Sequence, residues 1–214
     1  MKKKQDEQQR LVQMTEFERK YWQMGIFPCG MDEVGRGPLA GPVVAACVIM
    51  PPEPLIEYVN DSKKLTELRR EKLYDIIKET AIAYGVGWVD AEKIDELGIV
   101  PATKMAFEKA FSEMISKYPC EYALVDAVKG LNISAKQESI IHGDALSYSI
   151  AAASIIAKVE RDRFMIELDK EYPAYGFARN KGYGTKEHIA ALKTVGKCSE
   201  HRESFIHGII RKDI

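Results

Sequence analysis

The sequence predicts an α/β protein whose core is a central mixed β-sheet flanked by helices. The chain has 214 residues, 46% of them hydrophobic, which is enough for one domain with a proper core. Short apolar runs bounded by glycine or proline alternate with longer segments whose apolar residues recur at helical spacing. Strands that alternate with helices are typical of an α/β sheet.

The N-terminal segment, residues 1–27, differs from the rest in being polar and helix-favouring. Leu11, Met14, Phe17 and Tyr21 stand at roughly helical spacing, which predicts a short amphipathic arm. We expect this arm to pack against a single main domain formed by residues 28–214, with direct contact to a substrate as the alternative.

The elements of the main domain can be assigned in chain order. Residues 43–50 form a nearly continuous apolar run, which predicts a buried strand. Residues 66–80 are expected to form a helix with Thr66 as N-cap, and residues 81–89 a strand with alternating apolar residues. The remaining predictions are a helical turn at 94–98, a helix at 101–117, a strand at 122–125, and a long helix at 146–172 that Pro173 ends. The last residues, 211–214, are expected to fray.

The composition excludes some classes of protein. Lys and Arg total 31 and Asp and Glu total 32, so a formal net charge of -1 argues against a generally basic, histone-like binder. A local basic face would still be enough to hold nucleic acid. The four cysteines lack zinc spacing and are expected to be reduced, and neither a signal peptide nor a run of about 18 apolar residues is seen. We therefore expect a cytoplasmic protein with no membrane contact.

Four acidic residues stand apart because each lies at the end of a predicted element. Asp32 and Glu33 precede a glycine-rich turn, Asp126 ends a strand, and Asp144 directly precedes a helix. Taken singly, Asp32 and Glu33 are better explained as a solvated turn acid and a cap, Asp126 is equally well explained as a turn residue, and Asp144 can be an N-cap. Adjacent strand residues point to opposite faces, so the first two would reach one ligand only through a bend or a bulge.

If the four acids converge, they suit a hard divalent cation, Mg²⁺ or Mn²⁺, which prefers oxygen ligands. Two such ions about 4 Å apart are a known solution for phosphodiester cleavage. Asp162 is not expected to join them, because it follows Asp144 by 18 residues, about 27 Å along a continuous helix. We expect it to pair with a nearby arginine.

Two glycine-containing loops are candidates for contact with a ligand. Residues 35–41 match a dinucleotide-binding loop poorly, because Pro38 removes a backbone N–H and a strand follows. Such a turn can instead bring peptide groups and Arg36 close to a ribose 2′-OH. Residues 175–185 interleave aromatic residues, glycines and cations, which suits sugar stacking and phosphate contact, although a plain surface loop is an equal alternative.

Several segments, in order, resemble the motifs of the ribonuclease HII family within the type 2 ribonucleases H. They are Asp32 to Val43 (DEVGRGPLAGPV), Asp61 to Leu65 (DSKKL), Ala151 to Asp162 (AAASIIAKVERD) and Tyr175 to Thr185 (YGFARNKGYGT). The resemblance extends over about residues 28–207 and leaves the arm outside. It implies a ribonuclease H-like fold with a helical C-terminal part.

The resemblance also implies an activity and a set of site residues. The enzyme would be a metal-dependent endoribonuclease that degrades the RNA strand of RNA–DNA hybrids. It would also nick duplex DNA on the 5′ side of embedded ribonucleotides, leaving 3′-OH and 5′-phosphate ends. We expect the protein to be a monomer. The metal-binding and catalytic residues would be Asp32, Glu33, Asp126 and Asp144. The residues that bind substrate would be Gly35, Arg36 and Gly37 at the 2′-OH, Lys63 at a phosphate, and Tyr183 against the next sugar.

Two departures from the family pattern and three rival interpretations accompany this hypothesis. Ala127 stands where many relatives have glycine, and His142 where lysine is frequent. The rivals are a ribonuclease HIII, against which Arg36 and the short arm argue, a catalytically silent nucleic-acid-binding protein, and a nucleotide-dependent oxidoreductase.

Overall fold

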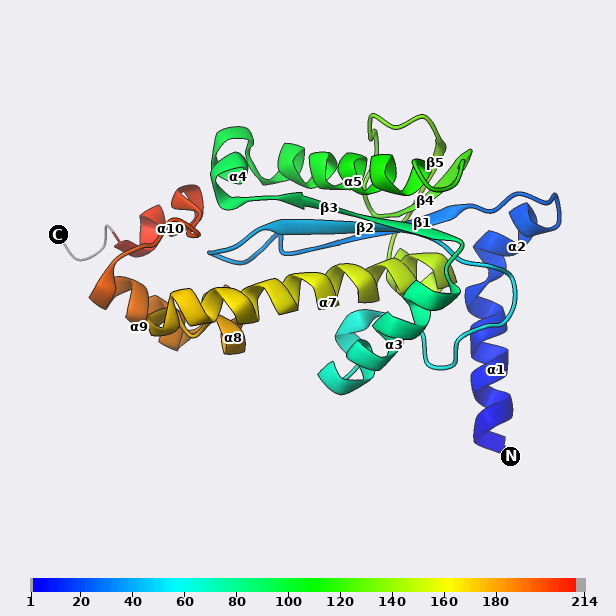
Figure 1. Ribbon diagram of the computed structural model, residues 1–214, viewed down its shortest axis with the longest axis horizontal. Coiled ribbons are helices and arrows are strands. Elements are labelled where there is room, and N and C mark those ends of the chain that lie inside the picture. Colours follow the sequence, from blue (N-terminus) through cyan, green and yellow to red (C-terminus); the bar gives the residue numbers. More distant parts are fainter. Residues whose placement is uncertain (1, 211–214) are drawn as a thin grey trace.

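A computed structural model, which describes residues 2–210, has a single five-stranded sheet in the order β3-β2-β1-β4-β5 (Figure 1). The strands are β1 (Cys29–Val34), β2 (Val43–Ile49), β3 (Ala83–Val89), β4 (Tyr122–Asp126) and β5 (Lys136–Ile140). β2 is antiparallel to both β1 and β3, whereas β4 is parallel to both β1 and β5. The predicted mixed sheet is confirmed.

The helices surround this sheet and continue beyond it at the C-terminal end. They are α1 (Lys2–Met14), α2 (Glu16–Trp22), α3 (Glu67–Thr80), α4 (Ala91–Leu97), α5 (Ile99–Ile115), α6 (Gly143–Leu146), α7 (Tyr148–Glu171), α8 (Phe177–Asn180), α9 (Lys186–Val195) and α10 (Glu203–Ile210). Short 3-10 turns are η1 (Ser62–Lys64) and η2 (Pro173–Tyr175). Figure 1 shows α5 along one face of the sheet and α7 along the other.

The strand β2 is covered on both faces, which explains its nearly continuous apolar sequence. All its residues are buried, because Val43, Ala45, Cys47 and Ile49 face the core beneath α5 while the alternate residues face α7. On β3 the buried positions are 83, 85, 87 and 89, whereas the larger side chains of Tyr84, Val86 and Trp88 are only partly buried. A Cβ on Gly87 would lie 1.9 Å from the Ala106 carbonyl oxygen, so glycine is what lets α5 approach the sheet.

Some elements differ from the predictions. The strand β1 and the helices α8 to α10 were not assigned individually, and two further differences concern α7 and β5. The helix expected over 146–172 is divided, because Ser147 is extended and caps α7 by accepting a hydrogen bond from the Ile150 N–H. The edge strand β5 was not predicted, since its sequence, KQESI, is polar, has only Ile140 buried and lacks an apolar pattern.

The N-terminal helices pack on the main body through a few apolar residues. Leu11 and Met14 are buried in the cluster that also contains Leu73 and Ile77 of α3, and Tyr21 is buried against Ile150. The division at residue 27 stays a prediction, and residues 211–214, expected to fray, lie outside the described part of the chain. Within residues 2–210, none of the helices has the length and apolar character needed to cross a bilayer.

Candidate active site

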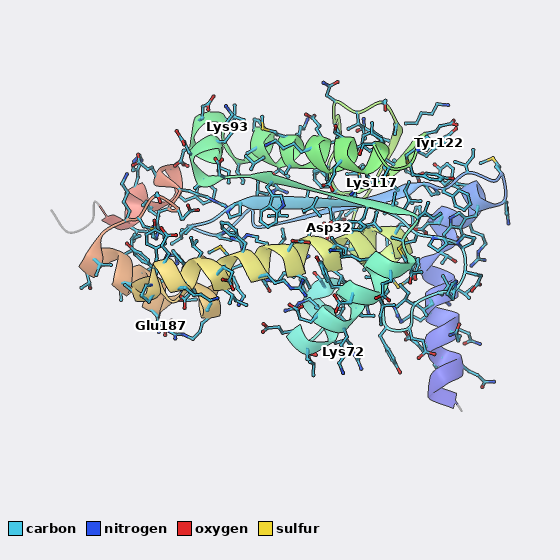
Figure 2. All side chains as sticks on the ribbon, in the orientation of Figure 1. Asp32, Lys72, Lys93, Lys117, Tyr122 and Glu187 are labelled. Atoms are coloured by element: carbon cyan, nitrogen blue, oxygen red, sulfur yellow. The ribbon has the colours of Figure 1, made fainter. Side chains whose placement is uncertain are left out.

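Three of the four predicted acids come together at one edge of the sheet. Asp32 lies on β1 and Asp126 ends the neighbouring parallel strand β4, so their side chains meet at the same edge. Asp144 reaches them from α6, and one carboxylate oxygen of each lies within 4.8 Å of the others. Figure 2 shows Asp32 near the middle of the molecule's long axis.

The chain between β5 and α7 is folded so that Asp144 faces the strands. His142 adopts a left-handed conformation with φ 58°, and the N–H of Gly143 donates to Asp126 Oδ1 at 2.7 Å. The N-cap position of α6 belongs to His142, so Asp144 does not cap the helix, which was the alternative for this residue. Its carboxylate instead accepts a hydrogen bond from Lys63 Nζ at 3.1 Å.

Glu33 lies beside this cluster but outside the set of three carboxylates. The pairing of β1 with β2 continues without a bulge through Asp32 and Glu33, so the bend expected there is absent and the two side chains leave opposite faces. Glu33 Oε1 accepts from Arg36 Nη1 at 3.2 Å, and its buried Oε2 has no hydrogen-bond partner among the described residues.

The carboxylates of the cluster repel one another. Burial raises the pKa of Asp32 well above its ordinary value, and the charges of Glu33 and Asp126 raise it further. Burial also raises the pKa of Asp126, against the hydrogen bond from Gly143, and Asp144 adds to the increase. Buried carboxylates with this little compensation fit a hard divalent cation, which would neutralise them and take their oxygens as ligands.

The predicted substrate-binding residues come from the turn after β1, from η1 and from the loop that contains Tyr183. Gly35 is buried with φ +91°, whereas Arg36 and Gly37 are exposed on the turn. A Cβ on Gly37 would lie 3.9 Å from Tyr183 Cε1, so the exposed Tyr183 ring borders this turn although it is 146 residues further along the chain. Lys63 is exposed next to Asp144.

Two further residues at the site were not predicted. Arg161 and Arg202 are fully buried, and their guanidinium groups donate to backbone carbonyls of the loop after β1. Arg161 lies within one of the motifs that carry the resemblance, but an arginine in a sequence is normally a surface residue, so its burial could not be read from the chain.

Asp162 and Ala127 do not belong to the set of three carboxylates. Asp162 lies apart from the cluster and forms ion pairs with Lys158 at 2.6 Å and Arg70 at 3.9 Å, so the arginine partner expected for it is confirmed. Ala127, where many relatives have glycine, has φ 48°, a conformation that costs an alanine about 1 kcal/mol or more.

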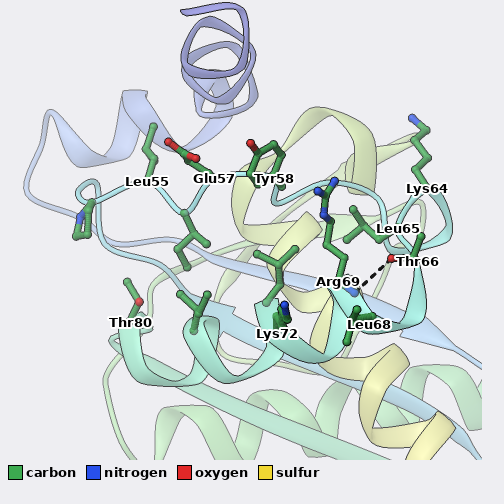
Figure 3. Close-up of a pocket in the computed structure, with 14 residues that line it drawn as sticks. Leu55, Glu57, Tyr58, Lys64, Leu65, Thr66, Leu68, Arg69, Lys72 and Thr80 are labelled. Atoms are coloured by element: carbon green, nitrogen blue, oxygen red, sulfur yellow. Dashed lines mark hydrogen bonds between the residues drawn. The ribbon is translucent and has the colours of Figure 1, made fainter. Parts of the chain in front are cut away.

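A separate groove lies between α3 and the loop that precedes it, and Figure 3 shows its side chains. Its volume is about 830 Å³, and its lining includes Leu55, Tyr58, Lys64 and Arg69. The four predicted acids are not among the described residues that line it.

Comparison with known proteins identifies the family. The family model described as Ribonuclease HII matches residues 29–208. A relative named Ribonuclease HII, from Caldanaerobacter subterraneus subsp. tengcongensis, is 54% identical over 203 residues, which cover 94% of this chain and 83% of the relative. The chain belongs to the ribonuclease HII family. Another ribonuclease HII, from Ruminiclostridium cellulolyticum, is 52% identical over 98% of this chain and 82% of its own length.

The ribonuclease HII assignment agrees with the fold. The crystal structure of the ribonuclease H2 from Pyrococcus horikoshii OT3 superimposes with a TM-score of 0.73 at 26% identity, covering 86% of this chain and 97% of that one. The fold is therefore ribonuclease H-like, and the chain is a nuclease of the hydrolase class. The oxidoreductase, the silent binding protein and ribonuclease HIII are thereby set aside.

Proposed function

We propose that this ribonuclease HII degrades the RNA strand of RNA–DNA hybrids and nicks duplex DNA on the 5′ side of embedded ribonucleotides. The observation that carries the proposal is the cluster of Asp32, Asp126 and Asp144 beside the turn of Gly35 and Gly37. A binding protein would gain nothing from buried, mutually repelling acids next to a polyanion, whereas a metal-dependent hydrolase needs them.

We propose that the three clustered acids hold Mg²⁺ or Mn²⁺ together with Glu33. Although Glu33 leaves the other face of β1, its charge raises the pKa of Asp32, so we propose that its long side chain reaches the same site without the expected bulge. When bound, two such ions would activate the attacking water and stabilise the leaving 3′ oxygen. The protein's own residues would orient these ligands: the Gly143 N–H fixes Asp126, and Arg36 fixes one oxygen of Glu33. The unpartnered Oε2 of Glu33 is then available as a ligand.

We propose that the substrate is held on the side of the cluster formed by the turn at 35–37. The exposed peptide groups of Arg36 and Gly37 would meet the ribose 2′-OH, which distinguishes RNA from DNA. Tyr183 would stack on the neighbouring sugar, and Lys63, 3.1 Å from Asp144, would contact a backbone phosphate close to the metal site. We further propose that the protein works as a cytoplasmic monomer, which the four free cysteines would suit.

The test uses an end-labelled DNA duplex with one ribonucleotide, incubated with the protein and Mg²⁺ or Mn²⁺. We expect a single nick 5′ to the ribonucleotide that EDTA abolishes, and no cleavage of the same duplex without the ribonucleotide. Cleavage confined to longer RNA segments would refute the nicking activity. Binding without cleavage under either metal would refute the enzymatic function altogether.

A further inference from the structure

The turn at 35–37 and the loop around Tyr183 are both attached to one short segment, Cys198 to Arg202. Leu39 N–H donates to the Gly182 carbonyl at 2.8 Å, which joins the two loops directly. Ala40 forms an isolated β-bridge with His201, and the N–H of Arg202 donates to the Leu39 carbonyl. Figure 1 shows the β1–β2 connection reaching towards the C-terminal helices.

We propose that Arg202 and the His188–His201 pair are positioning residues that set the two loops for recognition of the ribose. This inference rests on the proposed function and adds residues that lie behind the loops and would not touch the substrate themselves. Arg202 acts on the peptide groups of the turn, and the histidine pair acts on the backbone of Tyr183.

Arg202 fixes the peptide groups of the turn from inside the protein. Its guanidinium is fully buried and donates to the carbonyls of Gly35 at 2.6 Å, Arg36 at 3.0 Å and Gly41 at 2.7 Å. In a trans peptide the N–H points away from the preceding C=O, so holding these carbonyls inward directs the N–H groups of Arg36 and Gly37 outward. Those are the donors that a 2′-OH would meet.

Arg161 supports the same arrangement from α7. It donates to the carbonyls of Pro42 at 2.9 Å, Ala40 at 3.2 Å and Lys181 at 2.9 Å, so one side chain holds both loops. Burial lowers the pKa of Arg161 to about 10 and that of Arg202 to about 9. Burying two guanidinium groups against carbonyls costs desolvation free energy, which indicates that the loop geometry they impose is functional.

The histidine pair holds Tyr183, and its hydrogen bonds allow only one arrangement of protons. The Tyr183 carbonyl can only accept, so His188 Nδ1, at 2.9 Å, carries a hydrogen and its Nε2 is bare. The Cys198 N–H can only donate, so His201 Nδ1, at 3.0 Å, is bare and its Nε2 carries a hydrogen. The two Nε2 atoms are 3.0 Å apart, and this assignment places one proton between them.

Both rings must be neutral for this chain of hydrogen bonds to close. Burial lowers the pKa of His188, and burial with the neighbouring ring lowers that of His201 to about 4, so both stay neutral at physiological pH. The aromatic rings of Tyr175 and Phe177 pack against the pair and exclude water. The backbone of Tyr183 is thereby tied, through two rings, to the segment that ends in Arg202.

The test measures ribose discrimination separately from affinity. In an Asp32→Asn background with Mg²⁺, dissociation constants are measured by fluorescence anisotropy for a duplex with one ribonucleotide and for the identical all-DNA duplex. We expect Arg202→Lys and His188→Ala to lower the ratio of the two affinities by about tenfold, while all-DNA binding changes less than about twofold. His188→Asn, whose amide N–H lies near the position of Nδ1, should restore most of the ratio.

The matched control is Arg163→Lys on α7, whose side chain bonds Glu71 on α3 and lies away from both loops. It should leave the ratio unchanged. The inference would be overturned if Arg202→Lys and His188→Ala weakened binding to both duplexes by the same factor, or if the folded variants kept the affinity ratio of the parent. Either result would leave the proposed function unaffected. If the parent itself binds both duplexes equally, the proposed ribose recognition is wrong and the inference falls with it.

Discussion

At the scale of single residues, the site depends on charges that oppose one another. Asp32, Asp126 and Asp144 lie close together although their negative charges repel one another, and Lys63 hydrogen-bonds to Asp144. Such an arrangement is stable only because the rest of the fold imposes it. Changes at these residues should therefore affect activity and stability in opposite directions.

Replacing Asp32 with asparagine tests this directly. We expect Asp32→Asn to lower kcat for nicking by more than about a hundredfold, since outer-shell partners of a metal typically cost 10- to 100-fold and this residue is proposed as a direct ligand. The pKa of Asp32 is raised on folding, so stability is full below the ordinary carboxyl range and is lost as pH rises. The metal-free variant should therefore have a higher Tm than the wild type at pH 8.

The matched control for this change is Asp75→Asn, an exposed residue of α3. Its activity and Tm should match those of the wild type. Retention of more than a tenth of the activity by Asp32→Asn would remove Asp32 from the proposed metal site.

Lys63 offers a second test at the residue scale. It is exposed and 3.1 Å from Asp144, a place where a substrate phosphate would lie close to the metal site. We expect Lys63→Met to raise KM several-fold and to reduce the slope of log affinity against log salt by about 1, because one phosphate contact is lost. Lys93→Met, on α4, is the control, and an unchanged salt slope in Lys63→Met would contradict the phosphate contact.

At the scale of elements, the junction of α6 and α7 determines where Asp144 lies. Glu18 of α2 is fully buried and accepts hydrogen bonds from the Ser147 hydroxyl at 2.5 Å and the Ser149 N–H at 2.8 Å. These two hydrogen bonds satisfy donors at the first turn of α7, so the N-terminal arm stabilises the start of this helix just after the residue that reaches the site.

We expect Glu18→Ala to lower the free energy of unfolding by about 1–3 kcal/mol, because the Ser149 N–H would lose its acceptor inside the protein. Glu18→Gln keeps an acceptor and should be milder. Burial raises the pKa of Glu18, so its ionisation costs stability progressively as pH rises above the ordinary value of 4.5. In urea unfolding, the free energy of unfolding of Glu18→Gln should therefore increase relative to that of the wild type between pH 5 and pH 8. A difference that stays constant over this range would contradict the prediction.

At the scale of the whole molecule, the net charge of -1 conceals a concentrated acidic centre. An ion that binds the folded state alone stabilises it by mass action, about 2.7 kcal/mol when present at 100 times its Kd. For a chain of this size that corresponds to a rise in Tm of roughly 5–10 °C.

Thermal unfolding in saturating Mg²⁺, compared with EDTA, should therefore show a rise of this order, and the rise should disappear in Asp32→Asn. KCl at matched ionic strength is the control for general screening. An equal rise in wild type and variant would place the binding elsewhere.

The sequence by itself determined most of the framework. The apolar run at 43–50, the helix capped at Thr66 and the strand that ends at Asp126 are local patterns, because burial on two faces, caps and periodicity are written in neighbouring residues. The family followed from long motifs in order, and the resemblance to it implied the four acids. The break at Ser147 and the polar strand β5 were not predicted from the sequence, since neither changes the local apolar pattern.

Only the tertiary structure decided which of these residues meet. The parallel pairing of β1 with β4 brings Asp126 beside Asp32, and the regular pairing of β1 with β2 turns Glu33 to the other face. The buried Arg202 donates to carbonyls 161 to 167 residues away along the chain, and the two histidines that meet are 13 residues apart. Hydrogen bonds and charge repulsion act over a few ångströms in space, and distance along the sequence does not contain that information.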